Sequence, residues 1–322
     1  MSYAQGSLIE ATDYNNLIGA NNQTASGTVN PDTLHAAWAW GANSYGYGQT
    51  PISNVAVSST VTATQWATLV NTTNNANLHI RNTNSGLTAN TAGQTIGFSG
   101  GLPVAITRIN QDRLLFATNS AVIANHNSLT AYAAWTSTST SATLTRSFGA
   151  NVAFESPDKA RFFFNAGGRL KFNITATADA VARSVAAKAV IDNLGGLAIF
   201  GANTNGGRTG TGGTLGTNLT TVGYYNLTIA NVTVVSVTST TTSYTTDTGT
   251  ITVRTNGTKG QFNDNGDIVS FWATINSTAG SGAVSVNDSL SVTPTVTVDV
   301  SYPEVTNISN TWGAVTVTRQ GS

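Results

Sequence analysis

Ionisable side chains are scarce in this sequence, so few kinds of chemistry are open to it. The three histidines stand far apart, with no HxH or HxxxH spacing between them: His35, His79 and His126. A protein metal site draws its ligands from such groupings, so we expect no bound metal. The only glutamates are Glu10, Glu155 and Glu304, and no carboxylate pair has a context suited to acid–base catalysis. We therefore expect a protein that is not an enzyme and that uses no cofactor.

Two further motifs have the outline of a binding loop but lack its essential residues. The glycine-rich run 206–213 has no Lys-Ser/Thr ending, so a flexible loop is favoured over a phosphate-binding loop. The acidic run 263–267 lacks the alternating ligands and closing glutamate of a calcium loop, so it is interpreted as a turn.

The composition excludes several classes of protein. The chain has 322 residues, of which 40% are hydrophobic and only 9% charged, with 14 basic and 14 acidic residues and no cysteine. Binding to nucleic acid is disfavoured because neutralising phosphates requires clustered Lys and Arg. No apolar run approaches the roughly 18 residues of a membrane span, and no secretory signal pattern opens the sequence. Because a free monomer normally depends on net charge for solubility, we expect the chain to work in a larger assembly.

The first part of the chain contains an internal repeat, in which residues 8–18 align with residues 60–70. Thr12 and Thr64 are the predicted N-caps of two short helices, the second ending near residues 74–75. In each half an aromatic residue precedes two aliphatic residues by three and four positions, which makes one apolar helical face. These faces are predicted to be core and also to anchor the chain on a neighbour: Tyr14, Leu17, Ile18, Trp66, Leu69 and Val70.

Between the two halves lies a segment in which aromatic residues are interspersed with glycine. Its four large aromatic residues are candidates for a subunit contact or, as the less favoured alternative, a glycan contact: Trp38, Trp40, Tyr45 and Tyr47. Weak helical periodicity predicts a third helix over residues 106–119. We place a domain boundary there, so that residues 1–119 form a small helical domain for anchoring and assembly.

Residues 120–322 are predicted to form an antiparallel β-sandwich or jelly-roll. Apolar and polar residues alternate with a period of two, which indicates strands with one face toward solvent. The alternating segments are residues 142–145, 170–175, 233–238, 250–254, 268–275, 292–300 and 315–318. Pro294 within the sixth segment suggests an edge position or a bulge.

One helix is predicted within the sandwich, from the N-cap Ser156 to a stop at Gly167 and Gly168. It contains three consecutive phenylalanines: Phe162, Phe163 and Phe164. Successive helical residues lie about 100° apart, so the three rings must face different surroundings. We expect this helix to cover an open end or edge of the sandwich.

Four stretches of the sequence resemble those of a known group of proteins. They are residues 160–168, residues 11–18, residues 204–213, and residues 302–304 together with 312–313. Together they are similar to virion structural proteins of tailed bacteriophages, especially cyanophages and related aquatic phages, over nearly the whole chain. The resemblance implies a particle component that is made in the host cytoplasm and located in the virion.

These observations lead to one expectation and two alternatives. We expect a non-enzymatic virion structural protein of the tail (baseplate, fibre or neck), which assembles as a homo-oligomer and contacts other virion proteins. One alternative is a tail protein that binds a host-surface glycan or receptor through the sandwich loops. The other is a capsid decoration protein. None of these roles requires nucleic-acid binding or membrane insertion.

Overall fold

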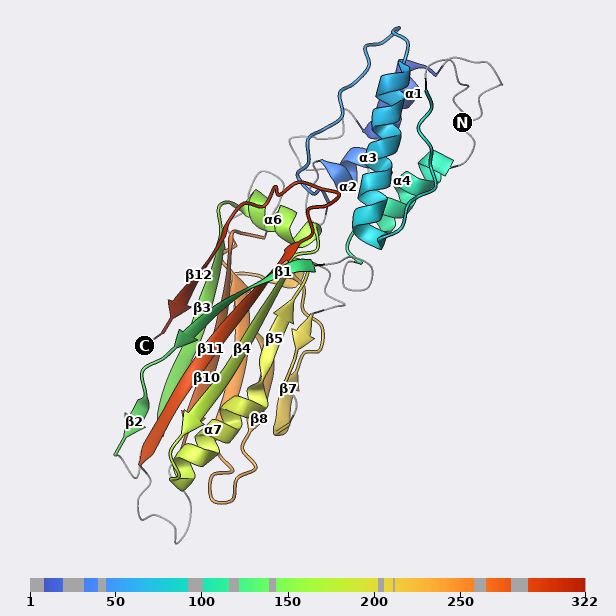
Figure 1. Ribbon diagram of the computed structural model, residues 1–322. Helices are drawn as coiled ribbons and strands as arrows, with labels where there is room; N and C mark the ends of the chain where they lie inside the picture. Colours follow the sequence, from blue (N-terminus) through green and yellow to red (C-terminus); the bar gives the residue numbers. More distant parts are fainter. Residues whose placement is uncertain are drawn as a thin grey trace.

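The computed structural model describes residues 9–19, 32–39, 45–91, 101–115, 122–138, 143–201, 206–210, 212–257, 265–278 and 289–321. The helices of residues 9–115 gather at one end of the molecule, and two β-sheets with the helices that pack on them form the rest (Figure 1). The predicted mainly-β class, with an antiparallel sandwich behind a small helical part, is confirmed. Parts of some predicted features lie outside the described residues: residue 8, Trp40, and residues 116–121, 142, 204–205, 211 and 263–264.

The helical part contains four helices: α1 (Ala11–Ile18), α2 (Leu34–Trp38), α3 (Ala63–Arg81) and α4 (Gly101–Asp112). The predicted repeat forms α1 and the first half of α3, but α3 continues well past residue 75. Helix α4 begins and ends earlier in the chain than the predicted range 106–119. Its third residue is Pro103, which a first helical turn tolerates because the missing N–H would have no helical partner there.

The predicted N-caps are wrong. Helix α3 is capped by Thr62, whose Oγ1 accepts a hydrogen bond from Gln65 N (3.2 Å) while Gln65 Oε1 accepts one from Thr62 N (2.8 Å). This reciprocal capping box satisfies two amide groups at once, which Thr64 inside the first turn cannot do. Helix α1 begins at Ala11 after Glu10, which makes no side-chain cap, and it ends at Gly19 with φ 76°.

Two antiparallel six-stranded sheets form the sandwich. In the first, the order is β1-β11-β4-β5-β6, and β2 also pairs with β11. Its strands are β1 (Val122–Ala131), β2 (Trp135–Ser137), β4 (Arg169–Ala178), β5 (Gly196–Ile199), β6 (Gly207–Arg208) and β11 (Leu290–Pro303). In the second, the order is β12-β3-β10-β9-β8-β7. Its strands are β3 (Leu144–Phe154), β7 (Thr214–Asn218), β8 (Val232–Thr238), β9 (Thr248–Thr255), β10 (Ile268–Ser277) and β12 (Val315–Gln320).

Pro294 does not lie on an edge strand, because β11 is between β1 and β4. It pairs with Ala176 of β4, and its carbonyl accepts a hydrogen bond from Tyr132 N (3.1 Å). Tyr132 belongs to the short connection between β1 and β2. Proline is accommodated inside the sheet because the neighbouring strand is interrupted opposite it, so no ladder donor is required there.

A second helix in the sandwich, α7 (Ala182–Leu194), was not anticipated from the sequence. It contacts β4 and β11 of the first sheet and β8, β9 and β10 of the second, and so packs against both layers. Two of its buried residues are alanines and one is Arg183, which donates from Nη2 to the carbonyl of Ser277 (2.8 Å). Because the buried face includes small and polar residues, the sequence shows no clear division of this helix into an apolar and a polar side.

The predicted phenylalanine helix is α6 (Pro157–Asn165), and it lies at the end of the sandwich nearest to the helices (Figure 1). Ser156 caps it by accepting a hydrogen bond from Lys159 N (3.2 Å). Gly167 ends it with φ 100°, and Gly168 N donates to the carbonyl of Phe163 (2.8 Å). The predicted cap, stop and covering position are confirmed.

The three phenylalanines of α6 face different surroundings, as expected. Phe163 and Phe164 are completely buried, with Phe163 against Phe154 (ring centroids 5.1 Å apart) and Phe164 stacked on Tyr224 (4.3 Å). Phe162 is only partly buried, and its ring lies directly against Gly48 of the helical part. The helix therefore joins the sandwich core on one side to the helical part on the other.

The division at residue 119 separates the helices from the strands but does not separate two cores. A smaller hydrophobic cluster contains all six residues of the predicted anchoring faces, with Leu17 at its margin. The larger cluster fills the sandwich and also includes five residues from the helical part: Ala37, Tyr47, Ala76, Ile80 and Ile109. Residues 1–119 are thus continuous with the sandwich core, and we call the helical part the helical module.

Replacing Phe163 by Ala should lower the free energy of unfolding by about 3–5 kcal/mol, because it removes a fully buried ring and leaves a cavity. Phe162→Ala is the matched control and should cost about 1 kcal/mol, because its ring is partly exposed. Equilibrium urea unfolding of both variants measures this difference. Equal costs for the two variants would contradict the two-sided packing of α6.

Candidate functional site

Polar contacts fix the helical module on α6. Asn165 donates from Nδ2 to the carbonyls of Tyr45 (2.9 Å) and Gly46 (3.0 Å), and Arg161 donates from Nη1 to the carbonyl of Tyr45 (2.7 Å). Both side chains are completely buried. Buried polar groups are costly unless they are hydrogen-bonded, so these bonds specify one position of the segment around residue 45 on the helix.

A second contact joins the module to the chain between β11 and β12. Gln49 is buried, and its amide pairs with the backbone of Ser309 in both directions: Nε2 donates to the carbonyl (2.9 Å) and Oε1 accepts from the amide (2.9 Å). These two hydrogen bonds resemble those between paired strands, and they join two segments that are 260 residues apart in the sequence. The module is therefore held at two places on the sandwich.

The aromatic segment was expected to form a flexible contact loop, and the structure corrects this for Tyr47. Its side chain is completely buried, its hydroxyl donates to the carbonyl of Arg113 (3.4 Å), and its ring packs edge-on against His79 (5.6 Å). It therefore has no surface for a glycan or a second subunit. Tyr45 lies under the guanidinium of Arg113 (3.7 Å from the ring centroid). Of the other candidates, Trp38 remains partly exposed and Trp40 is outside the described residues.

Both described histidines are buried in or beside the module, and burial makes their charged forms unfavourable. Desolvation lowers the pKa of His79 to about 4, although its bond to the carbonyl of Ala166 (2.9 Å) and the charge of Glu304 act in the opposite direction. Desolvation also lowers the pKa of His35 to about 4. His35 Nε2 accepts a hydrogen bond from Ile52 N (2.8 Å), which requires that nitrogen to be unprotonated. Both imidazoles are therefore neutral at physiological pH and pack inside the protein.

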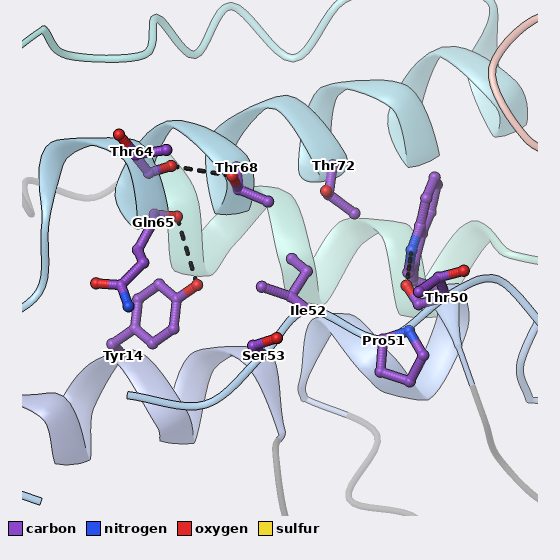
Figure 2. Close-up of a pocket in the computed structure, with 10 residues that line it drawn as sticks. Tyr14, Thr50, Pro51, Ile52, Ser53, Thr64, Gln65, Thr68 and Thr72 are labelled. Atoms are coloured by element: carbon purple, nitrogen blue, oxygen red, sulfur yellow. Dashed lines mark hydrogen bonds between the residues drawn. The ribbon is translucent and has the colours of Figure 1, made fainter. Parts of the chain in front are cut away.

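An open groove of about 420 Å³ lies in the module between α1, α3 and the segment 50–53 (Figure 2). We call it the threonine groove. Three threonines, each four residues apart on α3, line one wall: Thr64, Thr68 and Thr72. Residues four apart lie on the same helical face, about 6 Å apart along the axis. The remaining lining residues are Tyr14, Trp38, Thr50, Pro51, Ile52, Ser53 and Gln65.

Hydrogen bonds hold both walls of the threonine groove in place. Tyr14 donates from its hydroxyl to the carbonyl of Gln65 (3.4 Å), and Trp38 donates from Nε1 to the carbonyl of Thr50 (3.1 Å). Thr68 donates to the carbonyl of Thr64 (2.9 Å), as the close-up shows (Figure 2). Thr72 is only 9% exposed and points toward the groove, and its hydroxyl makes no hydrogen bond within the described part of the chain (Figure 2). A ligand here would meet an unpaired hydroxyl at the base of a preformed wall.

The threonine groove carries no charge. No Asp, Glu, Lys, Arg or His lines it, and its one ionisable group is Tyr14, whose pKa burial raises to about 12. The groove therefore stays neutral over the whole physiological pH range. It suits an uncharged partner with apolar and hydrogen-bonding groups, and its lining contains no carboxylate, histidine or lysine that could act as a general base toward its hydroxyls.

The residues of the predicted anchoring faces do not form this groove, apart from Tyr14. Ile18, Trp66, Leu69 and Val70 are at most 2% exposed and pack against one another inside the module, so they cannot also contact a neighbour. A contact with a neighbour must use another surface of the module. The sequence contained a signal for the threonine groove, because threonine recurs every four residues beside the apolar stripe of α3. Of these threonines, only Thr64 was assigned a role from the sequence, as an N-cap.

The described residues contain neither a metal-binding cluster nor a membrane-spanning helix. Within the described ranges, no three His, Cys, Asp or Glu side chains are grouped so that they could hold a metal ion. No helix in the described part of the chain is long and apolar enough to cross a membrane. In comparisons with known proteins, no family model, no curated protein and no solved structure matches this chain.

Acidification should destabilise the fold between pH 6.5 and about pH 4. The folded pKa of His79 and His35 (about 4) lies below the unfolded value of 6.5, so the unfolded state binds more protons than the folded state in this window. The free energy of unfolding therefore decreases as the pH is lowered. The expected loss is about 3 kcal/mol of unfolding free energy for each histidine.

Urea unfolding at several pH values tests this, with His79→Gln as the matched variant. Glutamine keeps a side-chain N–H that can donate to the carbonyl of Ala166 but cannot gain a charge. We expect it to lose about half of the pH dependence over this window. A pH profile identical to that of the natural chain would show that His79 is not a buried neutral group.

Proposed function

We propose that this protein is a non-enzymatic structural component of a tailed-phage virion, located in the tail and assembled by contacts between subunits. The sequence resemblance to cyanophage and aquatic-phage virion proteins supports the location. The low content of charged residues supports a role in an assembly, because a surface with little charge does little to prevent free monomers from associating. Among the described residues, those for which a strongly shifted pKa value is found, His35, His79, Tyr14 and Tyr47, are all buried inside the protein.

The observation that carries the proposal is the threonine groove in a module that is fixed rigidly on the sandwich. An anchoring device must transmit force to the body that it holds, and the buried contacts of Arg161, Asn165 and Gln49 provide this connection. The groove is a preformed, neutral and partly apolar concavity of the module. We propose that it receives an extended segment of a neighbouring virion subunit, whose backbone groups would pair with the threonine hydroxyls.

The edges of the second sheet provide a further surface for self-association. Strands β7 and β12 are its two outer strands, and every residue of β7 is exposed. An outer strand presents unpaired N–H and C=O groups that another chain can use, unless charges or proline protect it. Strand β7 has neither a charged residue nor a proline in its sequence TLGTN. This supports lateral contacts between copies in a homo-oligomer.

Mass spectrometry of separated phage tails and heads tests the location. We expect the protein in the tail fraction at a stoichiometry of several copies per particle, and absence from purified particles would contradict the proposal. Recovery in the head fraction alone would instead favour a capsid decoration protein.

A groove-filling variant tests the anchoring mechanism. Thr68→Trp places a large ring in the threonine groove from an exposed position, so it should leave the fold intact but lower incorporation into particles at least tenfold, about 1.4 kcal/mol of lost contact. Asn71→Trp is the matched control, because Asn71 is exposed on the same helix but does not line the groove. Incorporation is measured by complementing a phage that lacks the gene. Equal incorporation of both variants would contradict a role for the groove.

A further inference from the structure

The outward face of the second sheet is almost entirely covered by hydroxyl and amide side chains. Strand alternation turns Phe271, Ala273 and Ile275 inward and leaves the residues between them outward. Register places the outward residues of β3, β10 and β9 side by side. Those on β9 and β10 include Thr248, Thr250, Thr252, Trp272, Thr274 and Asn276. The face is thus polar and nearly uncharged, with one large aromatic residue in its middle.

The side chain of Trp272 lies flat on the sheet. Trp272 pairs with Gly149 of β3, and a Cβ atom placed on Gly149 would lie only 3.0 Å from Cδ2 and Cε3 of the indole. A Cβ on Gly321, just after β12, would lie 3.4 Å from Cζ3 of the same ring. The indole therefore extends sideways from β10 over β3 toward β12. Two glycines leave room for it, and the ring remains partly exposed.

Cross-strand hydrogen bonds hold the polar side chains around this ring in fixed positions. Ser147 and Thr274 join hydroxyl to hydroxyl (2.8 Å), and Thr145 donates to Oδ1 of Asn276 (2.6 Å). Asn276 in turn donates from Nδ2 to Oγ1 of Thr248 (3.2 Å). This row crosses three neighbouring strands. Side chains ordered in this way lose little conformational entropy when they bind a ligand.

We propose that this face binds a neutral polysaccharide, with one sugar ring stacked on Trp272 and its hydroxyl groups paired with the surrounding threonine and asparagine side chains. A sugar ring combines an apolar C–H face with a rim of hydroxyls, which matches a flat indole within a field of hydroxyl and amide groups. The only charged residue of β9 and β10 on this face is Arg254. These strands therefore offer little positive charge to pair with a polyanion. A protein partner is disfavoured because stable interfaces have a cluster of apolar anchors, and on β9 and β10 this face offers only Trp272 and, at the start of β10, the partly buried Ile268.

The site lies on the sandwich and is separate from the threonine groove, so it does not depend on the role of the helical module. Affinity electrophoresis of the full chain tests it, with gels that contain dextran, β-glucan, mannan or galactan as neutral probes and alginate as an anionic one. We expect at least one neutral polysaccharide to retard the protein. Trp272→Thr should weaken that binding about tenfold, because it removes the stacking surface but keeps a β-branched residue in the strand.

Two control variants keep the result interpretable. Trp272→Phe retains an aromatic face and should keep most of the affinity, and Thr177→Ala changes an exposed residue of β4 in the other sheet and should bind as the natural chain does. Thermal unfolding confirms that each variant is folded. Absence of binding to every neutral probe, or binding unchanged in folded Trp272→Thr, would overturn the proposal. So would loss of self-association in Trp272→Thr, measured by sedimentation, without any polysaccharide binding, because the face would then be a protein contact.

Discussion

The structure depends on how the open end of the β-sandwich is covered. Helix α6 seals it with Phe163 and Phe164, whose rings continue the core through Phe154 and Tyr224. The outer side of the same helix presents Arg161, Phe162 and Asn165, and these hold the helical module. One nine-residue helix therefore closes the core and orients the module. The burial of His79 against the carbonyl of Ala166, directly after α6, follows from this arrangement.

With few ionic groups, the chain uses neutral polar groups to specify its fold. Gln49 pairs with the backbone of Ser309, the capping box joins Thr62 to Gln65, and hydroxyl–amide rows cross the second sheet. The few charged side chains that are buried are also hydrogen-bonded, as Arg183 is to Ser277. Such bonds depend little on ionic strength, since they are not ion pairs screened by salt. A surface of the same kind is open to partners that offer hydrogen bonds rather than charge.

Much of the fold could be predicted from the sequence, because period-two alternation and turn chemistry are local signals. All seven predicted strand segments fall in or overlap strands, and the phenylalanine helix has its predicted cap and stop. Helix α7 could not be found in this way, because its buried side includes the polar Arg183 and Ser184 while the apolar Val185 faces solvent. The N-cap of α3 was misplaced by two residues because Thr62 and Thr64 are both plausible until the side chain of Gln65 is considered.

The candidate sites were harder to predict, because they depend on which surfaces pack internally. Nothing local distinguishes Tyr47, which is buried against His79, from an aromatic residue that faces solvent. The threonine spacing on α3 was visible in the sequence, but the facing segment 50–53 was not. Trp272 had the clearest unused signal, since it occupies an outward position in the alternation of β10. The glycines that let its ring lie flat come from β3 and from the end of the chain, which only register reveals.

The central claim is that the protein is a tail component held by its helical module. A cryo-EM map of the intact phage particle tests this most directly. The account predicts density for this fold in the tail, with an extended segment of a neighbouring subunit in the threonine groove between α1 and α3. A map that places the fold in the tail with the groove open to solvent would contradict the anchoring mechanism. A fully assigned particle without this fold would contradict the proposed function itself.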